Sequence, residues 1–155
     1  MEPKEQEWLQ SLHSENEAVR EQATQSLWQQ WFTQKGGWGL TALQQAQAAW
    51  DAGDRLGAEL LLDKVIAEAP DFAEAWNRRA VLHYLSERYL LSLRDCERAV
   101  TLNPAHFGAW HGVGLCRMLL GNWPEAIVAF QKALAIQPYA TVNQRLLLEC
   151  TLHLT

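Results

Sequence analysis

The chain has 155 residues, 48% of them hydrophobic and 20% charged, which suits one globular domain with a sizeable core. Eighteen acidic residues against 13 basic ones give a formal net charge of −5, which disfavours a general nucleic-acid-binding protein, because such proteins usually carry a basic face. No apolar run approaches the roughly 18 residues that span a bilayer, and the polar start MEPKEQEWLQ is unlike a signal peptide. We therefore expect a cytoplasmic protein that does not insert into a membrane.

Residues 1–38 are predicted to form a helical hairpin. A short first helix is indicated by Trp8, Leu9 and Leu12. In the second helix an apolar stripe recurs every four residues, which places its members on one helix face. The stripe consists of Val19, Ala23, Leu27 and Trp31.

The second helix of the hairpin has a predicted start and a predicted end. Ser14 is followed three residues later by Glu17, the pattern of a capping box. Gly36 and Gly37 are expected to end the helix. We expect the hairpin to cap the first unit of the remaining chain, and a role as a docking element is the alternative.

Beyond the hairpin, the chain repeats itself every 34 residues. Pro70, Pro104 and Pro138 stand at this spacing, and each follows an apolar helical stretch, as a helix-ending proline does. The same spacing separates Trp76 from Trp110, Ala80 from Gly114, Tyr89 from Trp123 and Ala99 from Ala133. The predicted units are residues 39–72, 73–106 and 107–140, which together form a repeat region over 39–140.

Each unit is predicted to be a pair of antiparallel helices. The breaks inside the units are DAGDRL, LSERYL and LLGNWP. Gly53 and Gly121 can take the left-handed conformation that ends a helix, and Asp54, Ser86 and Asn122 are suitable caps for the next one. Residues 141–155 are predicted to form a capping helix, whose many leucines make a homodimer contact the alternative.

This pattern resembles the tetratricopeptide repeat family, and the third unit is the best match. The overall look is similar to small stand-alone bacterial or plastid-type members with three repeats. The signature positions are Trp76, Ala80, Ala99, Pro104, Trp110, Gly114, Trp123, Ala126, Phe130, Ala133 and Pro138. The resemblance implies an all-α, right-handed solenoid of antiparallel helix pairs.

The stretch EAWNRRA, which begins at Glu74, could be read as a nucleic-acid-binding patch. However, its tryptophan recurs 34 residues later as Trp110. In the family this position packs a unit's first helix against its second, and Ala80 and Gly114 let the helices approach closely. Packing is therefore the favoured role of Trp76 and Trp110.

No catalytic or cofactor-binding pattern is present. The five histidines lack metal-ligand spacing, and no phosphate-binding loop or nucleophile motif occurs. The cysteines, Cys96, Cys116 and Cys150, are expected to be buried and reduced. We predict a protein that is not an enzyme and binds no metal or cofactor.

The resemblance implies a concave groove, lined by the first helix of each unit, that binds a partner peptide or helix. Trp50, Tyr84, Leu115 and Met118 are large side chains of the type that anchors interfaces, and Gly108 and Gly112 are expected to leave space beside His111. The alternative is that a terminal helix fills the groove. The expected partner-binding residues are Leu43, Gln47, Trp50, Asn77, Arg78, Val81, Tyr84, His111, Leu115 and Met118.

Family members that grip chaperone tails carry a carboxylate clamp of lysines, asparagines and an arginine in this groove. Here the clamp positions hold Leu43, Gln47, Arg78, Gly108 and Gly112. Only one is basic, so we predict that the clamp is absent.

The predicted function is a non-catalytic adaptor or assembly scaffold with a protein partner. Two alternatives remain at this point. One is a homo-oligomerising structural protein. The other is an RNA-binding helical repeat, although acidic residues lie among the arginines of the second unit, which are Arg78, Arg79, Arg88, Arg94 and Arg98.

Overall fold

The computed structural model describes residues 2–155, and over this range the chain forms nine α-helices and no β-strand. The all-α prediction is confirmed. The hairpin helices are α1 (Pro3–Ser11) and α2 (Glu17–Phe32). The remaining helices are α3 (Gly36–Asp51), α4 (Arg55–Glu68), α5 (Ala73–Leu85), α6 (Tyr89–Leu102), α7 (Phe107–Leu119), α8 (Trp123–Ile136) and α9 (Thr141–Leu152).

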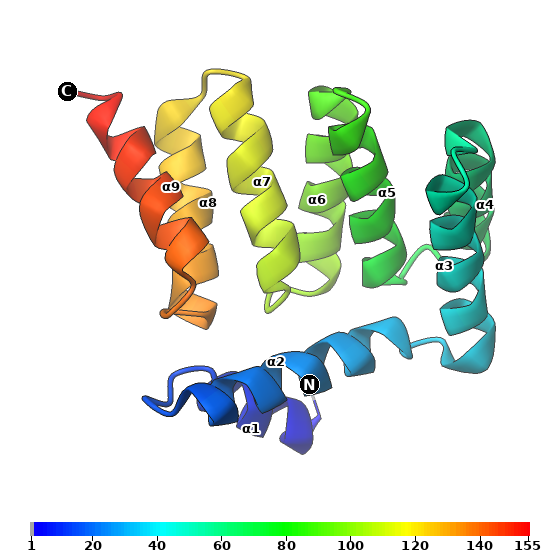
Figure 1. The fold of residues 1–155 in the computed structure, drawn as a ribbon, viewed down its shortest axis with the longest axis horizontal. Helices are drawn as coiled ribbons and strands as arrows, with labels where there is room; N and C mark the ends of the chain where they lie inside the picture. The colour runs from blue at the N-terminus through cyan, green and yellow to red at the C-terminus, as the bar shows by residue number, and fades with distance from the viewer. Residues whose placement is uncertain (1) are drawn as a thin grey trace.

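Helices α3 to α8 form three antiparallel pairs that stand side by side, with α9 following α8 at the end of the row (Figure 1). The apolar side of α9 packs against α8, where Leu146 and Cys150 join Ala126 and Phe130 in one core cluster. None of the helices within residues 2–155 is long and apolar enough to cross a membrane.

The turns inside the pairs follow the local chemistry of the sequence. Gly53 and Gly121 adopt φ values of +85° and +79°, as a left-handed helix end requires. In the middle pair no glycine is present, and Glu87 takes a φ of 60° instead. The Asp54 side chain accepts a hydrogen bond from the Gly57 amide at 2.9 Å and caps α4 as predicted. Ser86, the predicted cap of α6, instead follows the last residue of α5. Arg88 is the residue that precedes α6.

Two predictions about the ends of α2 and α3 are wrong. Ser14 and Glu17 do not form a capping box, because Asn16 precedes the helix and its side chain accepts from the Ala18 amide. The Ser14 hydroxyl instead accepts from the Asn16 amide. Gly36 and Gly37 do not end α2 but begin α3, three residues before the predicted unit boundary. The left-handed φ of Gly36, +66°, lets the chain turn into α3.

Trp76 and Trp110 each occupy the fourth position of a first helix and each link two neighbouring second helices. The Trp110 ring packs against Ala99 and Val100 of α6 and against the cluster that contains Ala129 of α8. Its indole N–H donates to the Pro104 carbonyl at 2.9 Å. In the same way, the Trp76 indole N–H donates to the Pro70 carbonyl at 2.9 Å. The same side chain therefore holds a helix pair together and ties it to the preceding loop.

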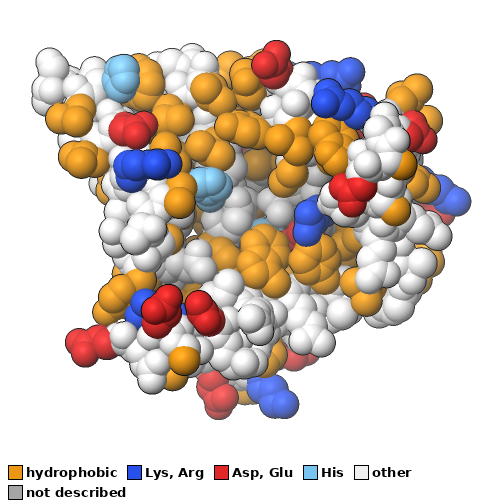
Figure 2. Space-filling model, in the orientation of Figure 1, with side chains coloured by type: hydrophobic (Ala, Val, Ile, Leu, Met, Phe, Trp, Pro, Cys, Tyr) orange, Lys and Arg blue, Asp and Glu red, His pale blue; other side chains and the backbone are white. Residues whose placement is uncertain are grey.

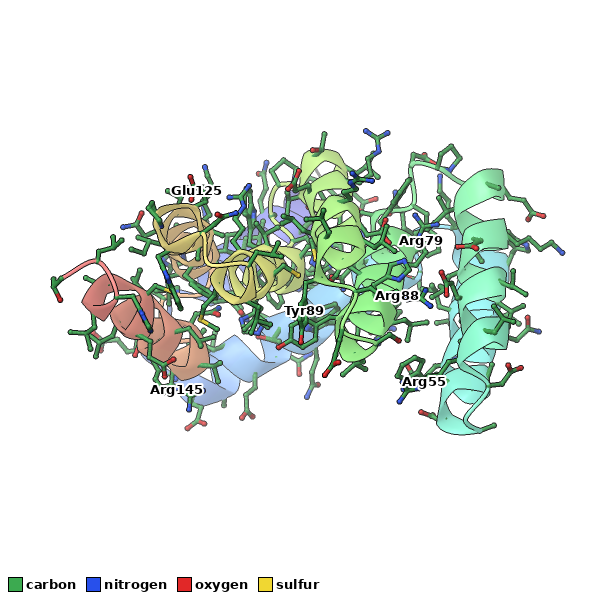
Figure 3. All side chains as sticks on the ribbon, turned by 90° about the horizontal axis from the view of Figure 1, so that it is seen from above. Arg55, Arg79, Arg88, Tyr89, Glu125 and Arg145 are labelled. Carbon is green, nitrogen blue, oxygen red and sulfur yellow. The ribbon has the colours of Figure 1, made fainter. Side chains whose placement is uncertain are left out.

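Arg79 makes a second link between pairs (Figure 3). It lies on α5 and forms two 2.8 Å hydrogen bonds with the buried Asp95 of α6 and one of 3.0 Å with Asp63 of α4. The hydrogen bonds that Arg79 donates to the Asp95 carboxylate raise the pKa of Arg79. Arg88 adds a contact of 3.2 Å to Glu59 of α4.

The hairpin does not cap the first pair, so the predicted position of α1 and α2 is wrong. Helix α2 runs across the edge at which α5 and α7 begin (Figure 1). Its buried residues Ala23, Leu27 and Trp31 pack with Phe107. In this position α2 covers aromatic side chains at the base of the third pair. The outer side of α4 stays uncovered, and Leu56 and Leu60 are largely exposed there.

Substitution of Gly114 tests the close approach of α7 and α8. An added Cβ at this position would lie 2.5 Å from the Phe130 ring, so Gly114→Ala should lower the free energy of unfolding by about 1–3 kcal/mol through overpacking. Gly37→Ala is the matched control, because a Cβ there meets nothing within 4 Å. Urea denaturation of both variants measures the difference. Equal stabilities would contradict the close packing.

Candidate concave binding groove

The first helices of the pairs face one side of the molecule, and this side is hollowed (Figure 2). Helix α2 runs along the lower rim of the hollow, below α5 and α7 (Figures 1 and 2). Hydrophobic side chains gather inside it. We call this hollow the concave groove.

The predicted groove residues of α3 differ in their access to solvent. Leu43 is buried in the core cluster between α3 and α4. Gln47 is exposed and donates to Asp51 at 2.9 Å. Trp50 is half-buried, and the Arg55 guanidinium lies 4.9 Å from the centre of its ring. This helix therefore offers the groove a polar side chain and one face of an indole.

Helix α5 places four predicted residues in or under the groove. Val81 is exposed, and Tyr84 is half-buried with its ring edge-on to Tyr89 at 5.6 Å. Burial raises the pKa of the Tyr84 phenol, which keeps it a neutral donor. Arg78 and Val81 line one small crevice together with Leu43 and Gln47. Asn77, in contrast, is buried.

The predicted residues of α7 mostly face α9. His111 and Asn143 of α9 form a short hydrogen bond at 2.5 Å. Leu115 and Met118 are half-buried and pack on the cluster that contains Leu146. These side chains shape the end of the groove and hold α9 in place.

The expectation that Gly108 and Gly112 leave space in the groove is wrong. An added Cβ at Gly108 would lie 2.7 Å from the Trp28 ring of α2, and one at Gly112 would lie 2.7 Å from the Cys96 sulfur. These glycines therefore permit the close approach of α2 and of α6, and the space beside them is filled.

Sequence reasoning missed the histidine that centres a buried polar group under α2. His106 and Glu74 are both 0% exposed, and His106 Nε2 lies 2.6 Å from Glu74 Oε2. The Ala109 amide donates to His106 Nδ1 at 3.0 Å, so Nε2 carries the proton and donates to the carboxylate. The sequence signal was weak, because His106 has no counterpart in the preceding unit, where Phe72 stands 34 residues earlier.

The same carboxylate has further partners on α5. The Asn77 amide donates to Glu74 Oε1 at 3.4 Å, and Arg78 Nε lies 3.3 Å from that oxygen. Glu74, Asn77, Arg78 and His106 are called the polar cluster below. The Arg78 guanidinium balances the charge of the Glu74 carboxylate within this cluster.

Within residues 2–155, no three His, Cys, Asp or Glu side chains come together as a metal site would require. The three cysteines are unpaired and buried. Burial raises the pKa of Cys150, which disfavours its reactive thiolate form.

Comparison with known proteins identifies the repeat. Models of the tetratricopeptide repeat match residues 43–105 and 107–140, which together make up more than half of the chain. The chain belongs to the tetratricopeptide repeat family. Such repeats are generally protein–protein interaction modules, and the matched ranges include most of the groove.

Two curated relatives resemble parts of the chain. A TPR repeat-containing protein of Rhizobium etli is 39% identical over 77 residues, which cover 50% of this chain and 38% of the relative. Anaphase-promoting complex subunit 3 of Schizosaccharomyces pombe is 28% identical over 89 residues, or 57% of this chain and 13% of the relative. The chain thus matches less than two fifths of either relative's length.

Solved structures share the fold. The first TPR of Spaghetti (RPAP3), bound to the HSP90 peptide SRMEEVD, superposes with a TM-score of 0.71 at 20% identity and covers 74% of this chain and 91% of that one. The Sgt2 TPR domain from Aspergillus fumigatus gives 0.68 at 20% identity, with coverages of 74% and 77%. MamA gives 0.67 at 22% identity, with coverages of 71% and 64%.

Proposed function

We propose that this tetratricopeptide repeat protein is a non-catalytic adaptor or assembly scaffold of the cytoplasm. It holds a peptide or helix of a partner protein in the concave groove. The observation that carries the proposal is the exposure of apolar side chains on the groove side of α5, where Val81 is 39% and Leu85 is 50% exposed. Apolar groups that stay exposed beside an aromatic side chain are typical of interaction surfaces.

The proposed roles follow from the access of each side chain. Val81 and Tyr84 anchor apolar parts of the partner, with Trp50 at the α3 side of the groove. Gln47 and Arg78 supply polar contacts. Leu43, Asn77, His111, Leu115 and Met118 support the groove walls through their buried or half-buried contacts.

Affinity capture from a lysate of the source organism tests the groove. The double variant Val81→Glu and Tyr84→Ala should lose the proteins that the wild type captures, because it places a charge in the apolar contact and removes an aromatic anchor. Circular dichroism verifies that the variant folds.

Val128→Glu is the control for that experiment. Val128 lies on α8 and is 47% exposed, so this variant adds the same charge outside the predicted groove residues. It should capture the same proteins as the wild type. Loss of capture by Val128→Glu alone, or retention by the groove variant, would contradict the proposed groove.

The chaperone-tail peptide SRMEEVD, seen with the related TPR domain, tests the proposed absence of a carboxylate clamp. We expect no binding tighter than about 1 mM, which corresponds to roughly −4 kcal/mol. Leu43 is buried, and the place beside Gly108 is filled by Trp28, so neither position can hold a carboxylate. Isothermal titration calorimetry measures the affinity, and a micromolar dissociation constant would refute the proposal.

Self-association through α9 is the second candidate function. Leu148 and Leu152 are 59% and 62% exposed on this helix. Large apolar side chains that are exposed side by side are typical of interaction surfaces. Light scattering over a range of concentrations should then show a dimer that Leu148→Glu converts to a monomer, while Leu60→Glu on α4 leaves it unchanged. A concentration-independent monomer rules this candidate out.

RNA binding receives less support. In the second pair, Arg78, Arg79 and Arg88 each contact a carboxylate, so their charges are partly neutralised within the protein.

A further inference from the structure

Helix α2 presents three aromatic side chains to the edge of the groove at which α5 and α7 begin. They are Trp28, Trp31 and Phe32, and their spacing of i, i+3 and i+4 places them on one side of the helix. Trp28 and Trp31 both contact His106 and Phe107, and Phe32 lies against Arg78. This side of α2 is called the aromatic face.

The surface under the aromatic face is shaped for it. The Trp31 ring stacks on His106 at 4.5 Å with 21° between the planes. The Arg78 guanidinium lies 4.7 Å from the centre of the Phe32 ring, within cation–π distance. At Gly108 the absence of a side chain admits the Trp28 ring. We call Arg78, His106, Phe107 and Gly108 the docking surface.

The docking surface combines the apolar Phe107 with polar groups. His106 is buried between the Trp28 and Trp31 rings and its partner Glu74. Because His106 Nδ1 accepts from the Ala109 amide, the imidazole is neutral and donates a hydrogen bond to the Glu74 carboxylate. Water can form hydrogen bonds with the same groups if α2 leaves this surface.

Few residues of the two hairpin helices are buried. Only three of the 16 residues of α2 are buried, and α1 has no buried residue. The joint to α3 is held by the Lys35–Asp71 pair at 2.7 Å, in which Asp71 is largely exposed. Exposed ion pairs stabilise a structure by at most about 1 kcal/mol. Besides the aromatic face, α2 is attached through Leu27, which packs in one cluster with Phe107 and Ile136, and through Arg20, whose guanidinium lies 4.1 Å from the centre of the Tyr139 ring.

We propose that the docking surface is a binding site for an amphipathic helix with aromatic residues at i, i+3 and i+4. Helix α2 fills this site within the chain, and a partner helix with the same aromatic spacing displaces it. The inference rests on the proposed function, since it specifies the class of partner that enters the groove from this edge.

A labelled peptide of residues 14–35, SENEAVREQATQSLWQQWFTQK, serves as the probe. The full chain with Trp28→Ala and Trp31→Ala should bind it at least about tenfold more tightly than the wild type does, because its own α2 competes less well. Fluorescence anisotropy measures the affinity. A peptide with all three aromatic residues replaced by alanine should not bind.

Gly108→Leu, added to that double variant, is the matched control. Its side chain occupies the place of the Trp28 ring, so peptide binding should be lost while circular dichroism still shows a folded chain. Failure of the folded double variant to bind the peptide would overturn the proposal. Equal binding with and without Gly108→Leu would do the same.

Hydrogen exchange of the wild type gives a second measurement that needs no substitution. Amides of α2 should exchange at least about tenfold faster than those of α5 and α7, as expected for a separately opening element. Equal protection would show that α2 is an inseparable part of the fold and would overturn the inference. Neither experiment uses the partner, so either can fail while capture through Val81 and Tyr84 succeeds.

Discussion

The stack depends on the contact that one tryptophan of each later pair makes with two second helices at once. Trp110 reaches α6 of the preceding pair and the cluster of its own α8, and its indole N–H donates to the Pro104 carbonyl in the loop between α6 and α7. One side chain on the first helix therefore fixes the position of that helix relative to the preceding loop and to both second helices. The small residue at Gly114 then lets α7 approach Phe130 closely.

That arrangement determines what the groove can contain. With the tryptophan directed toward the second helices, the opposite side of α5 carries Arg78, Val81 and Leu85 toward the hollow. Val81 and Leu85 remain exposed there. At the other end of the groove, the corresponding positions of α7 are partly used by α9, which packs on Leu115 and Met118. The groove is therefore most open over the middle pair, where the proposed contacts are concentrated.

Helix α2 gives this groove an edge that the repeats alone do not have. Its aromatic face covers the polar cluster, whose Glu74 carboxylate combines His106, Asn77 and Arg78 in one network. Hydrogen bonds satisfy these groups while they are buried, and water can satisfy them when they are not. Helix α2 covers apolar side chains as well, because Leu27 and Trp31 pack with Phe107 in one core cluster.

The sequence by itself determined the helices and their pairing. The 34-residue spacing of prolines and tryptophans, the left-handed glycines at Gly53 and Gly121 and the cap at Asp54 are local features, and local backbone preferences act on neighbours in the chain. The tertiary structure alone decided where the hairpin lies and which groove positions stay open. The helix periodicity of α2 identifies an apolar face but carries no information about the surface that it meets. The Glu74–His106 contact joins residues 32 positions apart, and the filled space at Gly108 depends on Trp28, 80 positions away in the sequence. Such contacts follow from the packing of whole elements, which no local pattern encodes.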